Sequence, residues 1–407
     1  MLKISNKIRH AFPFLLLTAY GVFTCSYFFF DEYSDPYRVF ARGVFVLGVF
    51  VFISSLKKFW GYPLFQIVAA YMLYILLSGF WSDPFEWFRF GQKFTIAVYI
   101  LCFISITYYL VHWNSVLYER MLQVCVLIAA VAAVISLASF YREHHFPSER
   151  LMAIGALTNI NEFANVFGVF AILAMGFALR MRKLQHQAPF LLAILAFIAV
   201  AWFGQSRTAF TSLILALLVL MGFMLNERKG LYAAILIAIA GALVLLFPGV
   251  LEEAMLRGQG LRPMIWAIGW REAISAPLFG HGFITPIVIH AGDRGFATLH
   301  NAYLQVFWQS GLIGLVLFLT LLAVAFRAAW SWGNQHRDYT IFCLFLFAAC
   351  TMMTGVDTLI DRPRDQWMLF WFPLALLLAH QAPGSPPGPG TTRLTDTNAN
   401  KSSGIPG

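Results

Sequence analysis

Residues 189–225 read PFLLAILAFIAVAWFGQSRTAFTSLILALLVLMGFML and set the fold class of the chain. Two apolar runs, 189–204 and 209–225, are separated only by the short turn 205–208. A helix needs about 20 mostly apolar residues to cross the hydrocarbon core of a bilayer, and short turns are normal between antiparallel neighbours. The stretch therefore predicts two antiparallel membrane-spanning helices with Arg207 in the turn between them.

The composition of the whole chain is that of a membrane protein. Of its 407 residues, 60% are hydrophobic, 12% are charged and 41 are phenylalanines, whereas a soluble domain has roughly 25% charged residues. A water-soluble fold of this length could not bury so much apolar surface, so lipid must be the solvent for most of it. The net charge of +9 therefore bears on orientation in the bilayer, and we predict no nucleic-acid partner.

Hydropathy predicts an all-α integral membrane protein with about twelve transmembrane helices. The membrane domain covers 1–382, and its first apolar stretch lacks a small-x-small cleavage site, so we predict a retained helix there. The one long outer loop, 249–302, is predicted to be partly helical, and the Pro/Gly/Ser/Thr-rich residues 383–407 predict a disordered cytoplasmic tail. The predicted spans are 11–30, 39–56, 64–81, 94–113, 121–140, 160–179, 189–204, 209–225, 231–248, 303–326, 339–356 and 366–381.

Lysine and arginine are distributed differently across these spans. With an inside N-terminus, the outer segments contain a single lysine, Lys93, and the cation bias of short loops then makes both termini cytoplasmic. Some outer arginines will be interfacial anchors, but arginine also binds phosphate or carboxylate bidentately through its planar fork. The outer face therefore predicts a site for an anion such as phosphate or pyrophosphate. Its arginines are Arg38, Arg42, Arg89, Arg142, Arg150, Arg207, Arg257, Arg262, Arg271, Arg294, Arg362 and Arg364.

A short helix is predicted within the outer loop. Pro263 suits a first helical turn, and Arg262, Trp266 and Trp270 then recur at a spacing of four on one face. Tryptophan favours the membrane interface, so the helix is predicted to lie along the outer leaflet. An anion at its N-terminus would meet both the guanidinium of Arg262 and unpaired backbone N–H groups. The alternative is that Arg262 only anchors the helix.

His300 is predicted to lie at the start of the tenth span. The positive end of the helix dipole disfavours a protonated imidazole there, and a neutral imidazole can act as a general base. The alternative is a structural hydrogen-bonding role. The sixth span contains two polar residues, Glu162 and Asn165, whose burial in a membrane costs free energy. Either helix packing or substrate contact would explain their presence.

No convincing metal site is found in the sequence. The cysteines Cys25, Cys102, Cys125, Cys343 and Cys350 all fall in apolar runs without CxxC spacing, which is typical of buried small hydrophobes. Asp357, Asp361 and Asp365 are spaced by four but are interrupted by arginines, and the consecutive residues 143–145 (Glu, His, His) would not converge on one ion. We predict neither metal nor cofactor, so any electrostatic catalysis would come from arginine.

The pattern resembles the signature of the O-antigen ligase and polymerase superfamily. The resemblance rests on Arg262 with Trp266, on PLFGHG at 277–282, and on HNAYLQ at 300–305 followed by GLIG at 311–314. Arg207 in GQSRT matches the conserved outer arginine of that family. Arg150 with 159–162 resembles its Arg…Asn-Pro-Asn stretch, although Ile160 stands where the family has proline. The resemblance covers roughly 140–330.

Membership would imply a GT-C-like fold and a metal-independent, inverting glycosyltransferase of the bacterial inner membrane with a periplasmic active site. Arg207 and Arg262, with Arg150, would hold the diphosphate of an undecaprenyl-linked glycan donor, and His300 would deprotonate or orient the acceptor hydroxyl. The leading expectation is an O-antigen ligase with lipid A–core as acceptor. The alternatives are a repeat-unit polymerase, a protein O-oligosaccharyltransferase, or a non-enzymatic transporter or flippase for an anionic lipid.

Overall fold

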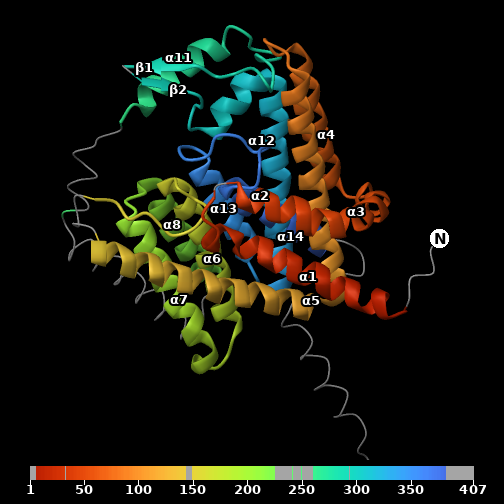
Figure 1. Ribbon diagram of the computed structural model, residues 1–407, viewed down its shortest axis with the longest axis vertical. Coiled ribbons are helices and arrows are strands. Elements are labelled where there is room, and N and C mark those ends of the chain that lie inside the picture. The colour runs from red at the N-terminus through yellow and green to blue at the C-terminus, as the bar shows by residue number, and fades with distance from the viewer. Residues whose placement is uncertain are drawn as a thin grey trace, which may run out of the picture.

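The computed structural model describes residues 6–32, 34–143, 149–224, 260–292 and 294–381, with the single positions Gly241 and Gly249 (Figure 1). Apart from Gly241, the predicted ninth span lies outside the described residues, as do the predicted tail at 383–407 and Arg257. The elements are α1 (Asn6–Phe29), α2 (Asp35–Val39), η1 (Phe40–Val44), α3 (Phe45–Phe59), α4 (Pro63–Ser78), η2 (Gly79–Trp81), α5 (Trp87–Glu143), α6 (Ile160–Arg180), α7 (Leu184–Phe203), α8 (Arg207–Phe223), α11 (Arg262–Ala273), β1 (Ile289–Ala291), β2 (Arg294–Phe296), α12 (Ala302–His336), α13 (Thr340–Thr351), η3 (Trp367–Trp371) and α14 (Phe372–Gln381).

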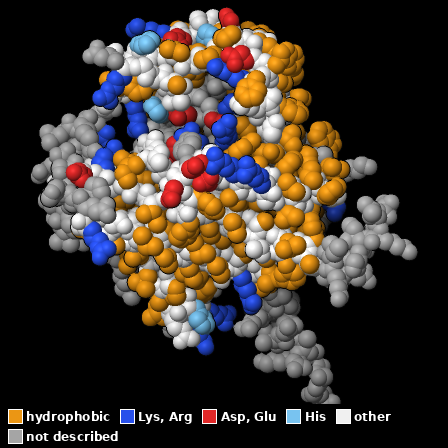
Figure 2. Space-filling view, in the orientation of Figure 1, with side chains coloured by type: hydrophobic (Ala, Val, Ile, Leu, Met, Phe, Trp, Pro, Cys, Tyr) orange, Lys and Arg blue, Asp and Glu red, His pale blue; other side chains and the backbone are white. Residues whose placement is uncertain are grey.

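The prediction of an all-α integral membrane protein is confirmed. Seven described helices are long and apolar enough to cross a bilayer, and three shorter apolar helices accompany them. In the described part of the chain, the one sheet is the small antiparallel hairpin of β1 and β2. Figure 2 shows a hydrophobic belt around the middle of the visible face, with charged side chains gathered above and below it. The count of about twelve spans stays a prediction.

Helix α5 combines two of the predicted spans, 94–113 and 121–140. The backbone leaves the helical conformation at Asn114 (φ −160°, ψ 92°). The side-chain oxygen of Asn114 then accepts a hydrogen bond from the backbone N–H of Leu117 at 3.0 Å, which caps the second half of the element. The break falls between the two spans, as the hydropathy predicted.

Helix α6 forms the centre of the packed domain, because the whole of its apolar window is buried inside the protein. Phenylalanines do much of this packing: Phe167 stacks on Phe28 of α1 at 5.0 Å and on Phe197 of α7 at 5.6 Å between ring centroids. Offset aromatic pairs of this kind add to the energy of simple burial. The abundance of phenylalanine therefore provides a rigid base for the polar segments at the helix ends.

Helix α12 is interrupted at Gly311, which adopts φ 64° and ψ −166°. The sequence predicted a span over 303–326, which α12 covers, but it did not predict this break. The segment 276–283 packs into the interruption, since His281 and Gly282 donate backbone hydrogen bonds to the carbonyls of Trp308 and Gln309 at 2.9 and 2.8 Å. A Cβ atom at position 311 would lie 2.2 Å from the carbonyl oxygen of Leu278, so the close approach of two backbones requires glycine there.

The predicted outer segments lie on one face of the domain. Lys93 at the start of α5 forms an ion pair with Asp361 at 3.2 Å, and the N–H of Asp83 donates to the hydroxyl of Thr285 at 3.0 Å. Figure 1 shows α11 and the β1–β2 hairpin beyond the outer end of α12, at one end of the molecule. On the opposite face, Arg180 forms ion pairs with Glu119 and Asp338. Loops separated along the sequence thus form one polar surface.

Candidate functional site

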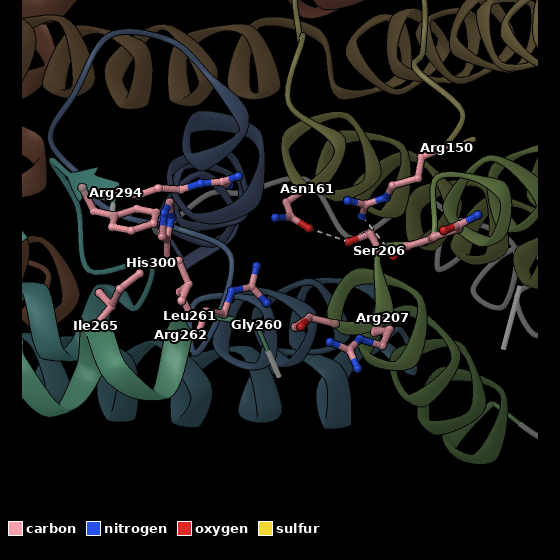
Figure 3. A pocket seen from close by; sticks show the side chains of 13 residues that line it. Arg150, Asn161, Ser206, Arg207, Gly260, Leu261, Arg262, Ile265, Arg294 and His300 are labelled. Atoms are coloured by element: carbon pink, nitrogen blue, oxygen red, sulfur yellow. Dashed lines mark hydrogen bonds between the residues drawn. The ribbon is translucent and has the colours of Figure 1, made fainter. Parts of the chain in front are cut away.

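The four residues predicted to form the site line a single cavity of about 520 Å³. Arg150 and Arg207 lie on one side of it, and Arg262 and His300 lie on the other (Figure 3). They come from three parts of the chain: the segment before α6, the α7–α8 turn, and the outer loop. The structure therefore brings together residues that the sequence placed only on a common face.

Helix α11 places Arg262 as predicted. The helix begins at Arg262, and Pro263 occupies its first turn. The indole N–H of Trp266 donates to the carbonyl of Leu299 at 3.0 Å. Leu299 also packs closely on the helix backbone at Gly269. Because Leu299 directly precedes His300, this packing fixes the distance between the arginine and the histidine.

The electrostatics of the cavity favour an anion. Burial lowers the pKa of Arg262 below its ordinary value, and the neighbouring guanidinium of Arg207 lowers that pKa further, while Asp357 acts in the opposite sense. Arg262 and Arg294 make no ion pair with any described residue. The guanidinium groups of Arg207 and Arg262 are close enough to repel each other, so an anion that contacts both would be attracted by both.

Arg150 is tied to the turn that carries Arg207. Its guanidinium donates hydrogen bonds to the carbonyls of Gly204 and Gln205 at 3.2 and 3.1 Å. Gln205 has a positive φ of 55°, and the hydroxyl of Ser206 donates to the side-chain oxygen of Asn161 at 2.8 Å. Arg150 was predicted as a ligand of the diphosphate. The structure adds that it holds the α7–α8 turn in shape.

His300 lies just before α12 rather than inside its first turn. Asn301 is the capping residue, and its side chain accepts from the N–H of Leu304 at 3.0 Å. His300 itself has a positive φ of 50°, which is uncommon for a residue other than glycine, although histidine adopts it more often than most residues do. The hydroxyl oxygen of Thr298 lies 3.3 Å from the ring nitrogen Nδ1 of His300.

Asp357 is a site residue that sequence reasoning missed. Its Oδ1 atom lies 3.2 Å from Nδ1 of His300. The same oxygen is buried and has no aligned hydrogen-bond partner among the described residues, and such misalignment is common in catalytic pairs before substrate binds. No sequence pattern indicates this contact, and the sequence suggested Asp357 only as a possible metal ligand with Asp361 and Asp365.

The polar residues of the sixth span hold the loop that carries Asp357. Glu162 forms an ion pair with Arg364, and the amide of Asn165 donates to Asp365 at 2.7 Å. Of the two readings left open by the sequence, helix packing therefore accounts for both side chains. A charged group inside a membrane protein is best tolerated when it is paired in this way.

Arg294 was counted among the outer arginines but not assigned to the site. It lies on strand β2, at the turn of a hairpin, and lines the same cavity. On the same strand, the ring of Phe296 meets the ring of His300 edge-on at 6.2 Å between centroids. The hairpin therefore adds a fourth arginine to the cavity wall.

Across the described residues, no group of three or more histidine, cysteine, aspartate or glutamate side chains is arranged to hold a metal ion. The cations of the site are arginine side chains.

The chain is similar to known proteins over most of its length. A family model described as O-antigen ligase matches residues 190–319, a range that contains Arg207, Arg262 and His300. An O-antigen ligase of Pseudomonas aeruginosa is 29% identical over 363 residues, covering 86% of this chain and 87% of that protein. The resemblance noted in the sequence is confirmed, and it extends beyond the loop to most of the chain.

Proposed function

We propose that this chain, which is similar to O-antigen ligases along most of its length, is itself an O-antigen ligase. It would transfer O-antigen polysaccharide from undecaprenyl diphosphate to a hydroxyl of lipid A–core oligosaccharide, on the periplasmic face of the bacterial inner membrane. The observation that carries the proposal is the convergence of Arg150, Arg207, Arg262 and His300 on one cavity. A diphosphate and a sugar hydroxyl are the two groups that such a cavity suits.

In this proposal Arg207 and Arg262 bind the diphosphate of the donor. Each guanidinium can form two parallel hydrogen bonds to phosphate oxygens. As the glycosidic bond breaks, negative charge grows on the leaving diphosphate, and fixed cations in a partly buried cavity stabilise that charge. Arg150 acts on the same step by holding the turn of Arg207, and Arg294 extends the cationic wall.

His300 is the proposed general base. With Asp357 beside Nδ1, the ring is held in the tautomer that leaves Nε2 able to accept a proton, as a carboxylate does for a catalytic histidine elsewhere. The acceptor oxygen bonds to the anomeric carbon from the face opposite the leaving group. The hydroxyl proton passes to Nε2, and the bonding electrons leave with undecaprenyl diphosphate, so the configuration inverts.

Two enzymatic alternatives use the same donor chemistry and differ in the acceptor. A polymerase would add a repeat unit to another lipid-linked glycan, and an oligosaccharyltransferase would modify a protein hydroxyl. The Pseudomonas aeruginosa protein that is similar to this chain over most of its length is an O-antigen ligase. This similarity favours lipid A–core as the acceptor. A transporter of anionic lipid is less favoured, because the carboxylate of Glu162 in α6 is paired with Arg364.

The proposal is tested by transfer in vitro. Purified protein in nanodiscs is supplied with undecaprenyl-diphosphate-linked O-antigen and with lipid A–core, a second lipid-linked glycan or a serine-containing protein acceptor. Polymer attached to lipid A–core in excess chelator is the expected product. Products on another acceptor would identify the corresponding alternative, and transfer that requires added magnesium or manganese would contradict an arginine-only mechanism.

A further inference from the structure

A second polar cavity lies on the far side of Asp357. It has a volume of about 340 Å³ and is lined by residues from the start of α5, from α12 and from the 355–364 loop. A narrow space of about 30 Å³ lies between the two cavities. It is lined by His300 and Asn161 of the first cavity and by Asp357, Thr358 and Arg364 of the second. The His300–Asp357 pair therefore stands where the two cavities meet.

The lining of the second cavity is suited to a sugar. Asp357 and Asp361 can accept hydrogen bonds from hydroxyl groups. The side-chain oxygen of Gln305 already accepts from Leu299 and the amide of Gln309 already donates to Phe283, which leaves the amide N–H groups of Gln305 and the oxygen of Gln309 for a ligand. The volume falls within the ~300–1,000 Å³ of ordinary ligand pockets. The charged and amide side chains of the lining favour a hydroxylated ligand over the isoprenoid chain of the donor.

Cations at the edge of this cavity add a preference for negative charge. Arg89 forms an ion pair with Glu86 through its Nε atom, which lies 2.9 Å from the Glu86 carboxylate. The two terminal nitrogens of the guanidinium therefore remain available for another acceptor. Lys93 is committed to Asp361 at 3.2 Å and lies over the ring of Phe283. Arg89 is thus the cation best placed to meet an anionic ligand that enters from outside.

Exposed aromatic residues adjoin the edge of the cavity. Trp87 and Phe88, which directly precede Arg89, are 73% and 75% exposed, and exposed aromatic residues of membrane proteins gather at the bilayer interface. The hydroxyl of Ser82 accepts from the N–H of Ile284 at 3.1 Å, so the rim is fixed to the outer loop. A lipid-anchored sugar would reach the cavity at this height.

We propose that the second cavity binds the acceptor, through a sugar that carries an anionic group recognised by Arg89. The reacting hydroxyl of the acceptor then reaches His300 through the narrow space beside Asp357. This assignment rests on the proposed ligase function. It separates the two substrates: the donor diphosphate occupies the arginine cavity, and the acceptor glycan occupies the cavity beyond Asp357.

The first test measures binding of purified lipid A–core to the protein without donor. Arg89→Ala is expected to weaken this binding about tenfold, which is the worth of one hydrogen bond to a charged group, and Arg89→Lys to weaken it less. Arg271→Ala is the matched control, because Arg271 is an exposed arginine of the outer loop that lines neither cavity. Equal binding by wild type, Arg89→Ala and Arg271→Ala would overturn the assignment.

The second test identifies the anionic group and separates this inference from the proposed function. Lipid A–core is used intact, dephosphorylated or with its carboxylates reduced; the treatment that abolishes the difference between wild type and Arg89→Ala names the group. A difference that survives both treatments would overturn recognition of an anion.

In transfer assays, Arg89→Ala should raise the KM for acceptor and leave the KM for donor unchanged. If acceptor binding depends on Arg89 but no transfer occurs, the proposed ligase function is rejected. The assignment of the second cavity to the acceptor then still stands.

Discussion

Oδ1 of Asp357 lies 3.2 Å from Nδ1 of His300, although His300 precedes α12 and Asp357 follows α13. A carboxylate at this position orients a histidine and stabilises its protonated form as it accepts a proton. Through Asp357, the 355–364 loop therefore contacts the proposed base, His300.

Asp357→Asn should lower kcat, by as much as about 10⁴-fold if the pair works as the Asp–His pair of a serine-protease triad does, because asparagine favours the wrong tautomer of the histidine. The loss should change the pH dependence of kcat, because the asparagine no longer stabilises the imidazolium. Asp35→Asn is the control, since Asp35 is paired with Arg38 on α2 and lines neither cavity. A pH profile of Asp357→Asn identical to that of wild type would assign Asp357 a purely structural role.

His300→Ala should slow transfer by about 10²–10⁴-fold, the usual contribution of general acid–base catalysis, while donor binding and thermal stability stay nearly intact. His300→Gln keeps a hydrogen-bonding group without basicity, so partial activity in that variant would favour orientation of the acceptor over proton transfer. In cells, lipid-linked polymer should accumulate while lipid A–core stays uncapped. Long polymer on the core of a strain with only His300→Ala would remove His300 from the mechanism.

Arg207→Lys and Arg262→Lys should each lose most activity although the charge is kept. A lysine ammonium cannot reproduce the planar fork that binds a diphosphate bidentately. The loss is measured as a rise in KM for the donor together with a fall in kcat, and Arg271→Lys serves as the control. Normal kinetics in both variants would mean that the cavity provides only a diffuse positive potential.

Arg150→Ala should destabilise the protein as well as reduce its activity. The carbonyls of Gly204 and Gln205 would lose their donors, at a cost of about 1–3 kcal/mol for buried polar groups left unsatisfied. Thermal unfolding in detergent should therefore shift downward in Arg150→Ala and less so in Arg262→Ala. Equal thermal stability in the two variants would contradict the role of Arg150 in holding the turn.

Single cysteines should distinguish the two faces of the membrane. In a background without the native cysteines, a cysteine at Met264, an exposed position on α11, should react with an impermeant thiol reagent in cells with a permeabilised outer membrane. A cysteine at Lys183, next to α7, should react only after the inner membrane is opened. Reaction at position 183 in sealed cells would reverse the predicted orientation.

The sequence predicted features that depend on local patterns. Pro263 marked the start of α11 and the 205–208 turn put Arg207 at a helix start, both of which the structure bears out, and apolar length predicted most of the long helices that the structure describes. It could not predict the contact of His300 with Asp357, because that contact depends on how α12 and α13 fold back on each other. The double role of Arg150 was hidden for a similar reason, since its partners are backbone carbonyls of a distant turn.

The interruption of α12 at Gly311 has a consequence for protein engineering. The carbonyls of Trp308 and Gln309 are capped by N–H groups of the outer loop, so the loop completes the helix and is not a detachable appendage. A graft of the loop from a homologous protein, cut at the start of α12, would leave polar backbone groups inside an apolar environment. Chimeras made to change substrate preference should therefore exchange residues 276–314 as one cassette.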